Sequence, residues 1–164
     1  MELPPPTPAR RRRPTPARLP GELTARAFTA LLPELVRPLL PMELAGFMVR
    51  GPMFSLVGFY YGADPKLHYE VWVQRWLGLV EVGLHLEADA ATNAAEFAAL
   101  SEHAGEIVAR LGPGVEGEPW TKHWARVHQS LPLEPLTPDF AAAVAERVAA
   151  FITVLQPLRR AATA

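Results

Sequence analysis

Apolar and polar residues alternate through the middle of the chain, which is the pattern of antiparallel strands with one buried face. Residues 53–61 are rich in β-branched and aromatic side chains, and a turn at 62–66 separates them from residues 67–74, which alternate strictly. A second turn at 75–78 leads into residues 79–87, where the alternation continues. These three segments predict a three-stranded antiparallel meander.

Apolar residues recur at helical spacing in three further segments. The spacing predicts a short helix over residues 21–32, ended or restarted at Pro33, and a longer helix over residues 90–111, ended at Gly112. A terminal helix is expected to start at the capping sequence 137–139, where a threonine precedes a proline and an aspartate.

The turn lengths and the alternation together predict the strand register, with Phe59 opposite Tyr69 and Val71 opposite Val82. One face of the sheet is then almost entirely apolar. We therefore expect an α+β fold, with an antiparallel three- to four-stranded sheet and two long helices packed on one face. The apolar face consists of Met53, Val57, Phe59, Tyr61, Leu67, Tyr69, Val71, Val73, Val80, Val82, Leu84 and Leu86.

Composition adds a division of charge along the chain. Residues 1–20 carry five arginines and one acid, together with seven prolines, whereas the whole 164-residue chain has a net charge of -1. This segment has few large apolar residues to bury, so we predict a disordered basic Pro-rich tail, followed by a single α+β domain over residues 21–164. The absence of cysteine excludes disulfides, thiolate nucleophiles and cysteine-ligated zinc.

No export signal or membrane span is visible in the sequence. Prolines and charged residues interrupt the stretch after the arginine cluster and the apolar segment 31–61, and both signals require an uninterrupted apolar run. The sequence therefore favours a cytoplasmic protein that has no membrane as a partner.

The opposite face of the predicted sheet carries the candidate chemistry. The register places Glu70 between two glycines, Gly58 and Gly83, and it places His68 opposite His85 in the next row. We expect a small-ligand niche here, with the full set Glu70, Trp72, Tyr60, His68, His85, Glu81, Gly58 and Gly83. Two imidazoles and a carboxylate suit general acid–base catalysis or a divalent metal. The alternative interpretation is a solvated polar face, and a bulge at either glycine would change the register.

Two other clusters have a structural and a functional interpretation. Residues 118–133 fit either a helix or an edge strand, and we favour a strand for their second half. Within them Trp120, Trp124 and Arg126 indicate packing more than base stacking. The glycines at 112–117 follow a helix instead of a strand, which argues against a dinucleotide loop.

The function predicted from sequence is a small cytoplasmic binding or interaction module that uses the open sheet face for a protein partner or a small ligand. The first alternative is a metal- or acid–base-dependent enzyme built on Glu70, His68 and His85. The second alternative is an accessory nucleic-acid binder that contacts phosphates through its tail, using Arg10, Arg11, Arg12, Arg13 and Arg18. The sequence implies no particular cofactor.

Overall fold

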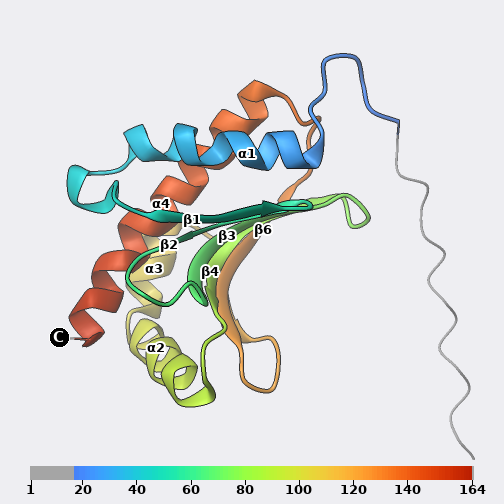
Figure 1. Ribbon diagram of the computed structural model, residues 1–164. Coiled ribbons are helices and arrows are strands. Elements are labelled where there is room, and N and C mark those ends of the chain that lie inside the picture. Colours follow the sequence, from blue (N-terminus) through green and yellow to red (C-terminus); the bar gives the residue numbers. More distant parts are fainter. Residues whose placement is uncertain (1–16, 164) are drawn as a thin grey trace, which may run out of the picture.

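The computed structural model describes residues 17–163 (Figure 1). It contains one six-stranded antiparallel sheet in the order β1-β2-β3-β4-β6-β5. The strands are β1 (Met48–Met53), β2 (Leu56–Tyr60), β3 (Leu67–Gln74), β4 (Leu79–Leu86), β5 (Glu116–Pro119) and β6 (Ala125–Pro132). The α+β class with an antiparallel sheet is confirmed. Most of the predicted tail lies in residues 1–16, outside the described residues.

The prediction of three to four strands was too low. Residues 53–61 do not form one strand. The chain turns at Phe54, whose φ is +52°, and residues after this turn form β2, which pairs antiparallel with β1. β1 is not recognisable as a strand in the sequence, because Gly51-Pro52 interrupts the alternation of apolar and polar residues. Four-residue β5 contains two acids, a glycine and a proline, so it has no strand signature. In the ambiguous segment 118–133, the favoured strand is confirmed as β6.

The predicted register of the central strands is confirmed. Phe59 pairs with Tyr69 across β2 and β3, and Val71 pairs with Val82 across β3 and β4. Neither strand pair contains a bulge. Alternate residues of three strands therefore share a face, as the periodicity predicted.

Residues 17–163 contain four α-helices, where the sequence predicted two long helices and a short one: α1 (Ala25–Val36), α2 (Ala90–Glu102), α3 (Ala104–Leu111) and α4 (Pro138–Thr163), with short 3₁₀ turns η1 (Arg37–Leu39) and η2 (Met42–Leu44) after α1. Helix α1 continues through Pro33, where the burial of Pro33 itself and of Val36 in the next turn offsets the cost of the lost backbone bond. The single helix expected over residues 90–111 is broken at His103, whose backbone leaves the helical conformation.

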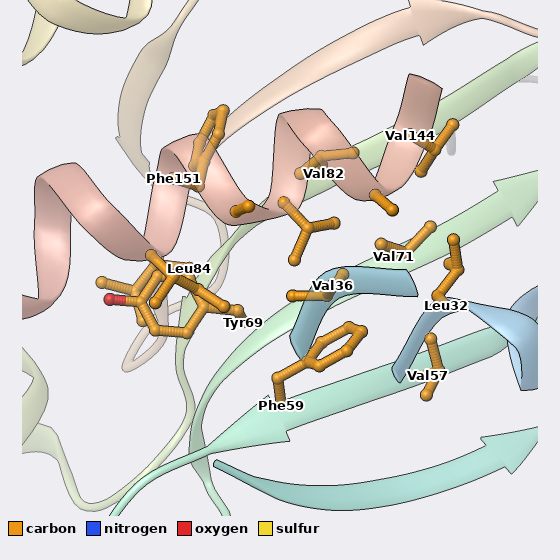
Figure 2. Packing of buried hydrophobic residues seen from close by; sticks show 14 of the residues in the cluster. Leu32, Val36, Val57, Phe59, Tyr69, Val71, Val82, Leu84, Val144 and Phe151 are labelled. Atoms are coloured by element: carbon orange, nitrogen blue, oxygen red, sulfur yellow. The ribbon is translucent and has the colours of Figure 1, made fainter. Parts of the chain in front are cut away.

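The core lies between the apolar face of the sheet and helices α1 and α4. Figure 2 shows Leu32 and Val36 of α1, and Val144 and Phe151 of α4, meeting the side chains of β2, β3 and β4. Of the predicted apolar face, only Met53 is clearly exposed, at 41%, because it ends the edge strand β1.

Helix α4 is apolar and long enough over Pro138–Arg159 to cross a membrane by length and composition alone, and 56% of that window is buried inside the protein. Its C-terminal part forms an ion pair with α2, in which Arg159 Nε of α4 lies 2.9 Å from Glu96 Oε2 of α2. The packing is that of a core helix.

Candidate functional site

The polar face, meaning the face of the sheet opposite the apolar core, has the predicted arrangement of residues. Glu70 lies between Gly58 on β2 and Gly83 on β4, and His68 lies opposite His85. The two imidazole rings are stacked, with their centroids 5.7 Å apart. The pairing continues onto β6, which adds His128 to the row of Glu70 and Arg126 to the row of the histidines.

This face is not solvated. His68 and His85 are each only 1% exposed, Glu81 is buried, and the Glu70 side chain is 11% exposed. Charged and ionisable groups are seldom this buried unless they pair with one another. The interpretation of the polar face as a water-exposed surface therefore does not hold for its centre.

The space expected beside Glu70 is filled. A Cβ atom on Gly83 would lie 2.6 Å from the His128 Cβ, and one on Gly58 would lie 3.3 Å from both the Arg50 Cβ and the His68 Cδ2. The glycines therefore admit neighbouring side chains. Cavities of about 150, 270 and 490 Å³ lie elsewhere in the described part of the chain, each lined in part by helices.

Each of the two stacked histidines has its Nε2 atom beside a carboxylate. His85 Nε2 lies 2.8 Å from Glu81 Oε1, and His68 Nε2 lies 3.2 Å from Glu70 Oε2. The other nitrogen of His85, Nδ1, lies 3.3 Å from Glu87 Oε1. His68 Nδ1 is buried and has no hydrogen-bond partner among residues 17–163. Trp120 Nε1 and His128 Nδ1 also have none, so three buried nitrogens among the described residues lack the partner that such groups normally have.

His68, His85 and Glu87 form a group with the composition of a metal site. One potential ligand atom from each lies within 4.8 Å of the other two. The site residues predicted from the sequence did not include Glu87. The available signal was the spacing of His85 and Glu87, because residues two apart on a strand point to the same side.

The surroundings of His85 favour a positive charge. Burial alone would lower the pKa of this imidazole, but hydrogen bonds to Glu81 and Glu87 and the charge of Glu70 raise the pKa to about 9. Burial would raise the pKa of Glu81 and Glu87, yet the bonds from His85 and nearby cations lower both values. The cluster therefore holds an imidazolium between carboxylates.

A second layer of side chains covers the cluster from β5, β6 and the turn between them. Arg126 Nη1 lies 2.9 Å from Glu81 Oε2, and Arg126 Nη2 lies 2.7 Å from Glu118 Oε1. The guanidinium carbon is 4.7 Å from the Trp120 ring centroid, and that indole meets His85 edge to face at 5.6 Å. The preference for packing over base stacking at Trp120 and Arg126 agrees with these contacts.

The remaining predicted site residues lie at the margin. Tyr60 and Trp72 are half-buried, and Trp72 contacts Trp76 with the ring centroids 5.6 Å apart. Arg18 is exposed, while the predicted nucleic-acid contacts at residues 10–13 lie outside the described residues.

Comparison with protein-family models, curated proteins and solved structures finds no match to this chain.

The raised pKa of His85 predicts a pH dependence of folding. The folded protein holds this proton more tightly than the unfolded chain does, so the stabilisation is complete below about pH 6.5 and is lost as pH rises through about 9. In the presence of a chelator, we expect the urea midpoint to fall over this range in the wild type and to fall less in His85→Gln. The exposed control His103→Gln should follow the wild type, and parallel curves for wild type and His85→Gln would contradict the charged state of His85.

Proposed function

We propose that the protein binds a divalent transition-metal ion through His68, His85 and Glu87. The observation that carries the proposal is the buried His68 Nδ1, which has no hydrogen-bond partner in the described chain and belongs to a compact group of potential ligands. A bound ion would accept the lone pair of this nitrogen and remove the cost of burying it unpaired.

The donor types indicate the class of ion. Two imidazoles and a carboxylate suit zinc and its neighbours among the transition metals, whereas magnesium and calcium prefer oxygen ligands alone. Glu70 and Glu81 contact the Nε2 atoms of the two rings, which is where carboxylates support metal-bound imidazoles. This assignment makes Glu87 the carboxylate ligand and gives Glu70 the supporting role.

The size of the site favours an ion over an organic ligand. Side chains fill the space at Gly58 and Gly83, but the three potential ligand atoms already lie within 4.8 Å of one another. Tetrahedral zinc with bonds near 2.0–2.1 Å separates its ligands by about 3.3 Å. Small side-chain rotations would close that difference, and the positive charge favoured around His85 would then be supplied by the metal.

The proposal is tested by titrating metal-free protein with zinc. We expect one zinc ion per chain by calorimetry, a rise in melting temperature and a reversal by chelator, while magnesium and calcium have little effect. At a free zinc concentration one hundred times the dissociation constant, the added stability is about 2.7 kcal/mol. The absence of heat and of a melting shift with zinc, cobalt, nickel and copper would overturn the proposal.

A further inference from the structure

A cavity of about 270 Å³ lies between helix α2 and the turn at residues 120–124, which joins β5 to β6. None of the three proposed metal ligands lines it. Sites for drug-sized molecules run from about 300 to 1,000 Å³, so this cavity suits a smaller molecule. Most of the lining residues are apolar, namely Ala90, Ala94, Phe97, Ala98, Pro119, Trp124 and Ala125.

Hydrogen bonds hold the turn against the helix. The Asn93 side chain, on α2, is buried, and its Nδ2 donates to the His123 carbonyl oxygen at 2.8 Å and to the Ala88 carbonyl oxygen at 2.9 Å. Within the turn, Trp124 N donates to Thr121 Oγ1 at 2.9 Å. The two walls of the cavity are therefore fixed before a ligand arrives, which lowers the entropic cost of binding.

The polar part of the lining is basic. Lys122 and His123 are consecutive and exposed, and neither side chain has a hydrogen bond or an ion pair within residues 17–163. No carboxylate lines the cavity. The nearest acid along α2, Asp89, caps the helix, and its two oxygens accept from Thr92 N at 3.0 Å and from Thr92 Oγ1 at 2.7 Å. The lining therefore offers an anion one ammonium group and one imidazole.

These features together define a ligand. Phe97 is half-buried and Trp124 is 38% exposed, so both rings have surface on which another aromatic ring can pack. One ammonium beside an imidazole matches the single charge of a carboxylate better than the near-double charge of a phosphate monoester. We propose that this cavity binds a small aromatic carboxylate, with its ring against Phe97 and Trp124 and its charge at Lys122 and His123.

The test titrates the full chain, with a chelator present, with benzoate, its neutral analogue benzamide and the non-aromatic cyclohexanecarboxylate, and follows the amide resonances by NMR. Benzoate should shift resonances of residues 119–125 and of the first turns of α2, and the shifts should saturate. We expect benzamide to bind about threefold to tenfold more weakly, and benzoate to lose a similar factor in Lys122→Gln. The exposed lysine outside the cavity provides the control, so Lys66→Gln should bind as the wild type does.

A matched pair of substitutions on α2 tests the position of the site. Ala94 and Ala95 are both exposed, but only Ala94 lines the cavity, so Ala94→Leu should fill it and prevent binding while Ala95→Leu should not. Leucine is a good helix former, and circular dichroism checks that both variants are folded.

Three results would overturn the proposal: no saturable shifts with benzoate, equal affinity for benzoate and the two analogues, or unchanged binding in Ala94→Leu. Zinc titration of the same variants should match the wild type, because the metal ligands are untouched. The carboxylate site and the metal site can therefore fail independently.

Discussion

Zinc binding is expected to weaken by more than about a hundredfold when either His68 or His85 is replaced by glutamine, because each substitution removes one of three proposed ligands. Glu87→Gln should have an effect of the same order. Glu70→Gln and Glu81→Gln should weaken binding by about 10–100-fold, which is typical of groups that orient a ligand from behind. Competition with a chromophoric chelator measures all five affinities.

The relative sizes of the losses in Glu70→Gln and Glu87→Gln show which of these two carboxylates binds the metal directly. The sequence-based hypothesis combined Glu70 with the two histidines, whereas the metal site proposed above has Glu87 as its carboxylate ligand. A larger loss of affinity in Glu70→Gln than in Glu87→Gln would restore the first assignment. The exposed His103 provides a matched control, because His103→Gln removes an imidazole that lies outside the polar face.

Gly83→Ala should destabilise the protein by about 3 kcal/mol, at the upper end of the range for overpacked interiors. The new Cβ would lie 2.6 Å from the His128 Cβ and 2.8 Å from the Val127 carbonyl oxygen, so strands β4 and β6 would have to separate. Urea denaturation of the metal-free protein measures this change directly.

The matched control is Gly105→Ala in α3. A Cβ at Gly105 meets no atom within 4 Å, and alanine is favoured over glycine in a helix, by up to about 0.5 kcal/mol at this first-turn position. We expect the two substitutions to change the free energy of unfolding in opposite directions. A loss below about 0.5 kcal/mol in Gly83→Ala would show that β4 and β6 are packed less closely than the structure indicates.

The central register was predictable because two independent constraints agree on it. Short turns fix which residues face each other, and a one-residue slip would have moved Val71 to the polar face and Glu70 into the apolar core. The outer strands lacked both constraints. β1 is interrupted by Gly51-Pro52, and β5 has no alternation, so only the structure reveals them.

The burial of the polar face was not predictable from the same pattern. Alternation shows which residues share a face but not what covers it. The cover comes from Arg50 on an unpredicted strand, and from Trp120 and Arg126 in a segment with two interpretations. With these side chains in place, His68, Glu70 and His85 form a buried network instead of a water-exposed row. Of the two ligand classes expected from the sequence, a small ligand and a divalent metal, the buried network favours the metal in our proposal.

The three proposed metal ligands come from one hairpin, since His68 lies on β3, His85 lies on β4, and Glu87 follows β4 directly. Eight consecutive residue pairs already join these two strands. An ion held there would connect parts of the chain that are neighbours without it, so the fold would not depend on its presence. We therefore expect the metal-free protein to remain folded, in contrast to a zinc finger, which is unfolded without its ion.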